Sequence, residues 1–370
     1  MSGSVDRVTG DPQPGDTVLV IDDANRPVAL ASYSPHSSIR ARVWTFDIEQ
    51  SIDDDFVANR VAAAAERRHR LGIANGDAVR LVFGEADGLP GLVVDRYGPV
   101  VVFQITTVGV DARRDAVVSA LASLDGVECV YERSDGDNRS REGLEPRTGV
   151  RHGSLPADVW AREGDLRFHV DVEHGHKTGF YIDQRDSRRL VARHSRDRAV
   201  LNVFGYTGSF SVAAARGGAA SITTIDSSGP ALRLAEANAR ANNVDIGDLV
   251  EADAFTELRS LRDRRASFDL IVLDPPKLAN NPNQVDRATR AYKDLNLLAL
   301  KLLRPGGLLF TYSCSGAVSS DLFQKVVAGA AVDANREAHI VGRLGQPSDH
   351  PIPLHFPEAE YLKGLIVLTL

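Results

Sequence analysis

Apolar runs and amphipathic segments alternate regularly in the second half of the 370-residue chain. The runs are rich in Val, Ile and Leu, a pattern typical of parallel strands that are buried on both faces. They predict strands at 199–204, 221–226, 248–253, 268–274, 307–313, 338–344 and 362–370. The segments between them predict helices at 209–218, 230–243, 285–303 and 319–331. Because no helix separates the last two strands, we expect them to form an antiparallel hairpin at one edge of a doubly wound, Rossmann-like α/β sheet.

The first half of the chain has shorter β-rich runs that are divided by turn residues. Its predicted elements are a small barrel within 14–46, a helix at 51–71, a β-rich unit at 78–107, a helix at 112–124, a strand at 126–135, and loops at 136–165. Together the two halves predict three domains, namely the barrel at 1–52, a central β-rich α+β domain at 53–165, and the doubly wound sheet at 166–370.

The composition argues against a membrane protein and against a small disulfide-rich protein. Hydrophobic residues make up 43% of the chain, enough for more than one core, and no apolar run approaches the roughly 20 residues that a membrane span needs. Two cysteines cannot build a disulfide framework, so we expect a reducing, cytoplasmic location. The pair His174 and His176 lacks further ligands at suitable spacing, and we expect no metal.

The net charge of −7 argues against a uniformly basic surface, but arginines cluster at 59–70, 139–152 and 184–198. Each cluster taken alone is more typical of a solvated helix face. Three clusters in an acidic protein make contact with RNA phosphates a reasonable hypothesis.

Ligands of doubly wound sheets bind beyond the carboxyl ends of the strands. The first such end, "NVFGYTGSFS", has two glycines but not the GxGxxG spacing of a dinucleotide site. Asp226 follows Gly205 by about 20 positions, the spacing of a ribose-binding acid, and Asp253 ends the next strand where it could meet an adenine. Turn glycines and helix-capping acids are the alternative for each position. Together they predict a site for S-adenosylmethionine (SAM), with candidate residues Asn202, Phe204, Gly205, Tyr206, Thr207, Gly208, Asp226, Ser227, Asp253 and Ala254.

"LDPPK" at 273–277 and "YSCSG" at 312–316 end two further strands. The prolines of the first motif leave a rigid tip with free carbonyls, and Lys277 takes the place of the aromatic residue that usually follows in amino-group methyltransferases. Cys314 would face Asp274 across one pocket. A buried core thiol is the alternative for Cys314, as we expect for Cys129, but a thiolate that adds to carbon 6 of cytosine would activate carbon 5 for methylation. A helix predicted to begin near 319 could lower the pKa of the thiol through its dipole.

These motifs, with "YSPHSSIRARVWTFD", "GEADGLPGLVVDRYG", "HKTGFYIDQR" and "FPEAEYLKG", resemble those of the PUA-containing bacterial 23S ribosomal RNA cytosine-C5 methyltransferases, a family of class I SAM-dependent enzymes. The resemblance extends over nearly the whole chain. It implies an RNA-binding PUA barrel at the N-terminus, Cys314 as the nucleophile, and Asp274 as the residue that holds the cytosine edge and borders the cofactor.

The same resemblance implies further contacts. Tyr181, Asp183, Gln184 and Arg185 would close over SAM, and 23S ribosomal RNA or a ribosome assembly particle would be the substrate. The candidate RNA-contact residues are Pro275, Pro276, Lys277, Arg67, Arg68 and Arg70. Family members usually have an additional stretch before the equivalent of "SGSVDRV", so we expect the PUA barrel to be incomplete.

Two other functions remain as alternatives. One is a guanine methyltransferase of ribosomal RNA that makes no use of the thiol, and the other is a non-catalytic ribosome-assembly factor. The oligomeric state stays open between a monomer and a homodimer.

Overall fold

The computed structural model describes residues 5–73 and 76–370, which form two compact units. The first unit contains the chain as far as Asp165 together with Val170–Ile182 and Ser348–Ala359. The second contains Leu166–His169, Asp183–Pro347 and Glu360–Leu370. Two segments that we predicted within the sheet domain, 170–182 and 348–359, therefore belong to the first unit.

The N-terminal part of the first unit is a three-stranded antiparallel sheet with the order β1-β2-β3. Its strands are β1 (Thr17–Ile21), β2 (Pro27–Tyr33) and β3 (Ala41–Thr45). Among the described residues these three strands form an open sheet rather than a closed barrel, because closure needs more strands.

The central part of the first unit is a five-stranded sheet with the order β4-β5-β6-β7-β8. Its strands are β4 (Val79–Phe83), β5 (Leu92–Tyr97), β6 (Val100–Ile105), β7 (Cys129–Ser134) and β8 (Arg147–Gly153). Cys129 is fully buried and pairs in register with Val100, so its predicted packing role is confirmed, and burial raises the pKa of its thiol.

The prediction of loops at 136–165 is wrong, because this segment contains β8 and also β9 (Trp160–Glu163). β8 is an edge strand whose side chains are almost all exposed, so it has none of the apolar alternation that marks a half-buried strand. The helical elements of the first unit are α1 (Asp54–Arg70), η2 (Gly84–Asp87), α2 (Val108–Asp111), α3 (Arg114–Ala122), η3 (Ser140–Glu142) and η6 (Pro357–Ala359).

The second unit is built on a seven-stranded sheet with the order β13-β12-β11-β14-β15-β17-β16. Its strands are β11 (Ala199–Val203), β12 (Ser221–Asp226), β13 (Asp248–Glu251), β14 (Phe268–Leu273), β15 (Leu303–Ser313), β16 (Ala338–Gly345) and β17 (Lys363–Thr369), and β10 (Leu166–His169) also belongs to this unit. β11 to β15 are parallel, whereas β17 is antiparallel to both β15 and β16. The predicted antiparallel hairpin at the sheet edge is thus confirmed.

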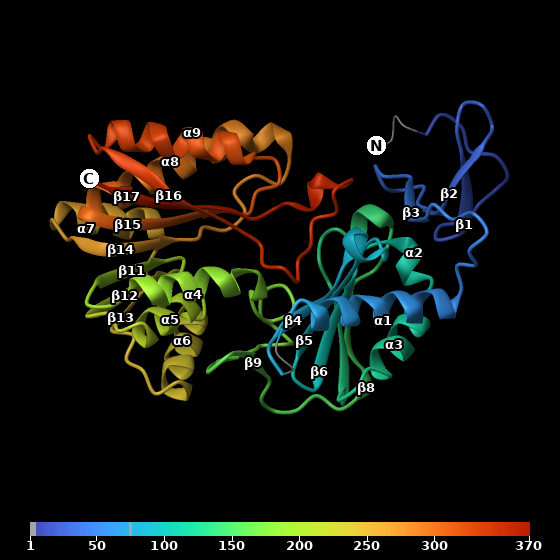
Figure 1. The fold of residues 1–370 in the computed structure, drawn as a ribbon, viewed down its shortest axis with the longest axis horizontal. Coiled ribbons are helices and arrows are strands. Elements are labelled where there is room, and N and C mark those ends of the chain that lie inside the picture. The colour runs from blue at the N-terminus through green and yellow to red at the C-terminus, as the bar shows by residue number, and fades with distance from the viewer. Residues whose placement is uncertain (1–4, 74–75) are drawn as a thin grey trace. The chain divides into compact units, whose positions relative to one another are not determined.

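Helices cover both faces of this sheet (Figure 1). The helical elements are η4 (Ile182–Gln184), α4 (Arg185–His194), α5 (Ser209–Arg216), α6 (Gly229–Ala241), α7 (Ala254–Asp263), η5 (Pro282–Gln284), α8 (Val285–Leu302) and α9 (Ser320–Asp333). Neighbouring strand residues point into different cores. Leu201 and Ile271 pack with α7, α8 and α9, whereas Val200 and Leu270 pack with α4 and α5. This double burial explains the uninterrupted apolar runs of the sequence.

α7 is not among the predicted helices, because only Ala254, Leu258 and Leu261 of its ten residues are buried and most of the others are polar. Within the described part of the chain, no helix is long and apolar enough to cross a membrane. No group of three or more His, Cys, Asp or Glu side chains there could hold a metal ion.

Candidate active site

The strand order places a topological switch point between β11 and β14. After β11 the chain continues outward to β12 and β13, and it then returns to β14 and β15 on the other side of β11. In open α/β sheets the crevice beyond the carboxyl ends of such strands is the usual ligand site. The segments that follow β11, β12, β14 and β15 carry most of the site residues predicted from the sequence.

The loop after β11 has an unusually constrained backbone. Phe204 and Tyr206 have φ values of 61° and 47°, in the left-handed region that non-glycine residues seldom adopt. A Cβ atom at Gly205 would lie 2.3 Å from Thr224 Cγ2, so only glycine fits there. The amide of Gly205 donates to the Ile225 carbonyl at 2.9 Å. Backbone strain of this kind persists where the surrounding structure enforces it, as at ligand-binding loops.

Buried polar atoms on β11, in the loop after it and just before α4 suit an adenosine-bearing cofactor. Within the described part of the chain, Asn202 Oδ1, Thr207 Oγ1 and Gln184 Oε1 are buried and have no hydrogen-bond partner. A buried polar atom without a partner costs free energy that a bound ligand can recover. Hydroxyl and amide oxygens of this kind match the ribose hydroxyls and amino groups of such a cofactor.

The two acids at the strand ends also hold the protein backbone. Asp226 accepts hydrogen bonds from the amides of Tyr206 at 2.7 Å and Ser228 at 2.9 Å. Asp253 caps α7, and its Oδ1 atom accepts from both the amide and the hydroxyl of Thr256. The capping role that the sequence left as an alternative is therefore present at Asp253, whereas the cap of α6 is Ser228 and Asp226 holds the loop after β11 instead. Ser227 is exposed and Ala254 is the buried first residue of α7.

At the end of β14, Asp274 is half-buried and accepts a hydrogen bond of 3.0 Å from Gln184 Nε2. Gln184 directly precedes α4 and is itself 2% exposed. The structure thus brings together two predicted site residues that are 90 positions apart. After Asp274, Pro275 is buried, whereas Pro276 and Lys277 are exposed.

At the end of β15, Cys314 is half-buried and its Sγ atom lies 4.0 Å from the Pro275 carbonyl oxygen. The predicted juxtaposition of the thiol and the DPPK tip is therefore present. The fully buried Ser315 fixes it, because Ser315 Oγ accepts from the amides of Leu278 at 3.2 Å and Ala279 at 3.1 Å. The Tyr292 hydroxyl lies 3.0 Å from the same Oγ atom.

Two site residues at the start of β17, Tyr361 just before the strand and Lys363 as its first residue, had no predicted role. Lys363 Nζ donates to the Ser315 carbonyl at 2.9 Å, and the Tyr361 hydroxyl donates to Asp183 Oδ2 at 2.6 Å. Burial lowers the pKa of Lys363, with opposing contributions from Glu360 and Cys314. The sequence signal was a lysine at the head of the apolar run "LKGLIVLTL".

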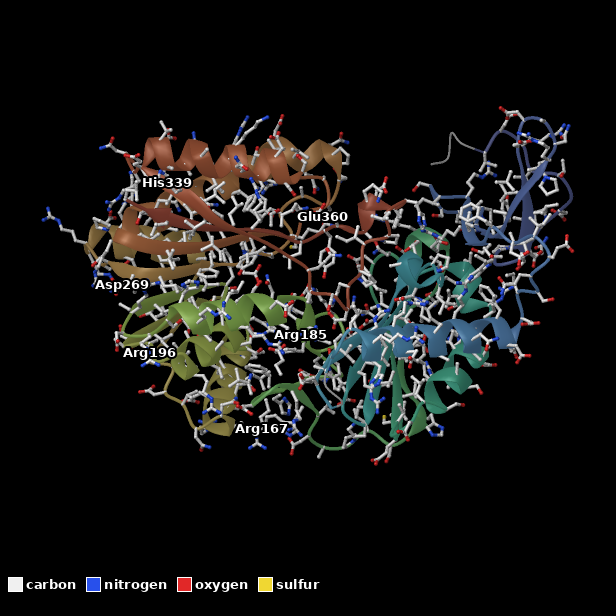
Figure 2. All side chains as sticks on the ribbon, in the orientation of Figure 1. Arg167, Arg185, Arg196, Asp269, His339 and Glu360 are labelled. Carbon is white, nitrogen blue, oxygen red and sulfur yellow. The ribbon has the colours of Figure 1, made fainter. Side chains whose placement is uncertain are left out.

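The segment "HKTGFYIDQR" divides between the two units. Tyr181 belongs to the first unit, where its hydroxyl lies 3.1 Å from His176 Nδ1 and the Lys177 ammonium lies over its ring. Arg185 belongs to the second unit and is buried at the start of α4, whereas Arg196 lies just beyond the end of that helix (Figure 2).

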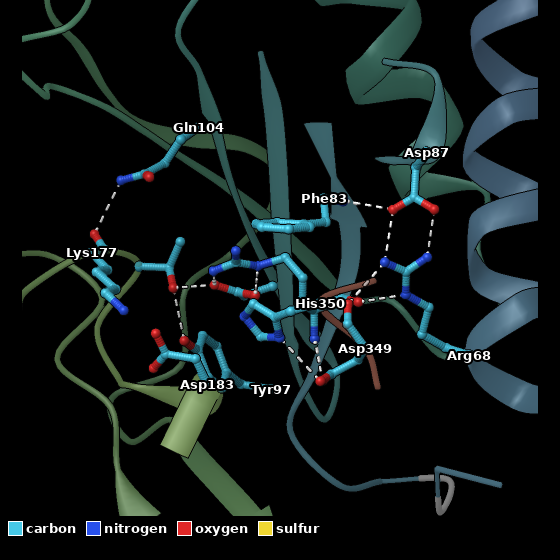
Figure 3. Close-up of polar contacts among 12 residues, drawn as sticks. Arg68, Phe83, Asp87, Tyr97, Gln104, Lys177, Asp183, Asp349 and His350 are labelled. Atoms are coloured by element: carbon cyan, nitrogen blue, oxygen red, sulfur yellow. Dashed lines mark hydrogen bonds and ion pairs between the residues drawn. The ribbon is translucent and has the colours of Figure 1, made fainter. Parts of the chain in front are cut away.

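The prediction that Arg68 contacts RNA is wrong. Its guanidinium is buried in the first unit and forms a bidentate pair with Asp87, at 2.6 and 2.7 Å (Figure 3). It also donates to the carbonyls of Arg80 and Asp349. Arg68 occupies the buried face of α1 because it continues the helical spacing of the buried residues Val57, Val61 and Ala64.

The neighbouring arginines of α1 differ in exposure. The Arg67 side chain is 45% exposed and also pairs with Asp87, whereas the Arg70 side chain is 76% exposed and pairs with Glu66 on the helix surface. Of the three predicted arginines, Arg67 and Arg70 therefore remain accessible to a polyanion.

Comparison with protein-family models identifies two regions. Residues 150–368 match the model described as S-adenosylmethionine-dependent methyltransferase, which covers more than half of the chain. Residues 1–46 match the model of a PUA-like domain. The α/β methyltransferase fold and the PUA-like domain expected from the sequence are thus confirmed, and with them SAM as the cofactor.

A curated relative is similar along nearly the whole chain. The Shewanella frigidimarina protein named ribosomal RNA large subunit methyltransferase I is 49% identical over 362 residues, which cover 96% of this chain and 91% of that protein.

Two solved structures share the fold. One is assigned as a SAM-dependent methyltransferase from Streptococcus mutans, with a TM-score of 0.84, 22% identity, and coverage of 97% of this chain and 93% of that one. The other is a methyltransferase complexed with SAH, with a TM-score of 0.85, 23% identity, and coverage of 96% and 92%.

Proposed function

The chain belongs to the S-adenosylmethionine-dependent methyltransferase family, and we propose that it forms 5-methylcytosine in large-subunit (23S) ribosomal RNA. The choice of RNA is supported by the name of the 49% identical relative, a ribosomal RNA large subunit methyltransferase, and by the PUA-like domain. The choice of carbon 5 rests on one observation, the half-buried thiol of Cys314 beside the carbonyl of Pro275.

The residues around the β11 and β12 ends would hold the cofactor. Asn202, Gly205 and Thr207 would contact it from the constrained loop, and Asp226 and Asp253 would accept hydrogen bonds from its hydroxyl and amino groups. When bound, SAM supplies an electrophilic methyl group. Tyr181 and Arg185 remain proposed cofactor contacts.

Cys314 would act as the nucleophile. Carbon 5 of cytosine is a poor nucleophile until a group adds at carbon 6, and a thiolate can form that bond. After methyl transfer to carbon 5, loss of the carbon 5 proton and cleavage of the sulfur–carbon 6 bond return the thiolate and release 5-methylcytosine. The protein must therefore hold the thiol rigidly against the face of the base, which the buried Ser315 and Tyr292 allow.

Asp274 would hold the edge of the base. A carboxylate accepts a hydrogen bond from the exocyclic amino group of cytosine, a contact that uracil cannot provide. Gln184 fixes the carboxylate by donating to its Oδ2 atom. The exposed Pro276 and Lys277 would border the neighbouring nucleotides.

The target cytosine must be unpaired or flipped out of its helix, because a base within a duplex cannot reach a thiol at a strand end. The substrate would therefore be 23S ribosomal RNA, free or in an assembly particle. The PUA-like domain and the exposed arginines of α1 would contribute RNA affinity.

Nucleoside mass spectrometry of large-subunit ribosomal RNA tests this function. RNA from cells that lack the chain should lose one 5-methylcytosine, and expression of the wild-type chain should restore it while the Cys314→Ala variant does not. Loss of a methylguanosine instead, or full restoration by Cys314→Ala, would exclude the proposal.

A further inference from the structure

A lysine is buried next to the proposed nucleophile. Lys363 is the first residue of β17, and it is only 6% exposed. An ammonium is costly to bury unless anions or strong acceptors surround it. Burial at this position therefore calls for a negatively charged neighbour or a strong acceptor.

The strand register places Lys363 beside Cys314. Lys363 pairs with Ser313 in the antiparallel ladder of β15 and β17, and its Nζ atom donates to the Ser315 carbonyl at 2.9 Å. Cys314 lies between these two contacts. A lysine ammonium has three donors, so the hydrogen bond to Ser315 does not exhaust it.

The charges near Lys363 indicate which anion its ammonium stabilises. Burial lowers its pKa, the charges of Glu360 and Cys314 raise it, and Lys277 lowers it. Glu360 is exposed, where solvent weakens its attraction, whereas Cys314 is half-buried. The attraction that favours the ammonium equally favours a thiolate at Cys314.

We propose that Lys363 is a positioning residue that keeps Cys314 in its thiolate form. The inference rests on the proposed function, in which Cys314 is the nucleophile, and it assigns a task to a residue beyond that function. The ammonium acts through the thiol and need not touch the base.

Other titratable groups surround the thiol and bear on its ionisation. Asp274 and Lys277 come from the β14 end, Glu360 from the segment before β17, and Tyr292 from α8. Burial raises the pKa of Tyr292, and the charge of Cys314 raises it further, so its hydroxyl stays neutral at physiological pH. Asp274 opposes a thiolate, and Lys277 is exposed. Among these groups and Lys363, the lysine on β17 is the one buried cation.

The rate of iodoacetamide alkylation as a function of pH measures the ionisation of Cys314 directly. The full chain would carry Cys129→Ala, so that Cys314 is its single thiol. Its alkylation midpoint should lie below the value of about 8.5 for a free thiol. Lys363→Met should raise the midpoint by about one unit, so that alkylation at pH 7 slows about tenfold.

Three further variants separate charge from structure. Lys363→Gln retains a donor but has no charge, and it should behave as Lys363→Met does. Lys363→Arg retains the charge and should restore the low midpoint. Lys325→Met, which removes an exposed lysine of α9, should leave the midpoint unchanged. Thermal melting and SAM calorimetry confirm that each variant is folded, and Lys363→Gln replaces Lys363→Met if the latter does not fold.

The inference is overturned if folded Lys363→Gln has the wild-type midpoint. Because alkylation requires neither RNA nor methyl transfer, its result is independent of the proposed function. A raised midpoint in a protein that forms no 5-methylcytosine would support the role of Lys363 and reject the function. An unchanged alkylation midpoint in a variant of an enzyme that forms 5-methylcytosine would reject the role of Lys363 and support the function. If the enzyme is active, the apparent pKa of the acid limb in a plot of kcat against pH should rise in Lys363→Gln by the same amount as the alkylation midpoint.

Discussion

The Cys314 Sγ atom and the Pro275 carbonyl oxygen lie 4.0 Å apart, although 39 positions separate the two residues in the chain. The parallel strands β14 and β15 bring the two motifs to the same edge of the sheet, and Ser315 joins them. A thiol in this setting has a fixed position relative to the Pro275 carbonyl, and a nucleophile requires such a fixed position whereas a residue that only fills space does not.

Ser315→Ala should uncouple the two strand ends. The amides of Leu278 and Ala279 lose their acceptor, which should lower stability by about 1–3 kcal/mol. The rate of methyl transfer should fall at least tenfold, because small errors in the position of a reacting group are costly. Denaturant titration and single-turnover kinetics measure the two effects. The exposed Ser320→Ala should change neither, and a Ser315→Ala enzyme with wild-type turnover would contradict the positioning role.

Asp226→Ala should weaken SAM binding. A hydrogen bond to a charged acceptor contributes about 1.5–3 kcal/mol, or roughly tenfold to a hundredfold in affinity. Isothermal titration calorimetry of the chain without RNA measures it. Because Asp226 also accepts the Tyr206 and Ser228 amides, Asp226→Asn serves as the milder comparison. Unchanged affinity in both variants would show that Asp226 only holds the Tyr206 and Ser228 amides.

Arg70→Ala should reduce the salt dependence of RNA binding if α1 contacts phosphates. Removal of one phosphate contact lowers the slope of log K against log salt concentration by about 0.7–0.9. Filter binding at several salt concentrations gives the slope. The exposed Lys325→Met of α9 is the matched control. An unaltered slope would show that Arg70 serves only the surface pair with Glu66.

Asp87→Asn should destabilise the first unit by about 3–5 kcal/mol at pH 7, since it leaves the buried Arg68 guanidinium without its counter-charge. Burial raises the pKa of Asp87, but the hydrogen bonds and charge of Arg68 and Arg67 outweigh it and lower the pKa below the usual value. The ionised carboxylate therefore stabilises the fold above the unfolded pKa of about 3.9, and this contribution is lost as the pH falls through the lower folded pKa.

Urea titrations at pH 7 and pH 3 check this prediction for Asp87. The gap between wild type and Asp87→Asn should be large at pH 7 and smaller at pH 3. Asp23→Asn, at an exposed position of the same unit, should leave the unfolding midpoint at pH 7 unchanged. A gap that does not narrow at low pH would mean that lost packing, not lost charge, destabilises Asp87→Asn.

Much of the second unit could be predicted from the sequence because its central strands are buried on both faces. Apolar runs predicted the strands, and the carboxyl ends of parallel strands meet at one edge, which predicted that Cys314 comes close to the tip that contains Pro275. Local spacing alone left Asp226 and Asp253 between cofactor binding and capping, since a carboxylate suits both roles.

Other features depend on contacts that the sequence pattern does not reveal. Lys363 reaches the site only because β17 runs antiparallel to β15, and the register of that pairing has no local signal. β8 is an edge strand held by backbone hydrogen bonds, so its exposed side chains resembled a loop. The burial of Arg68 could have been predicted from the sequence, because its spacing from Val61 and Ala64 places it on the buried face of α1.

The central claim, that Cys314 attacks cytosine, is tested most directly by RNA that carries 5-fluorocytosine at the target position. Fluorine at carbon 5 blocks the proton loss that frees the enzyme, so a covalent protein–RNA adduct should accumulate in the presence of SAM. Peptide mass spectrometry should map the adduct to Cys314. Cys129→Ala should still form it, while Cys314→Ala should form none and yet bind SAM as wild type does. An adduct on Cys129, or methylation by Cys314→Ala, would contradict the account.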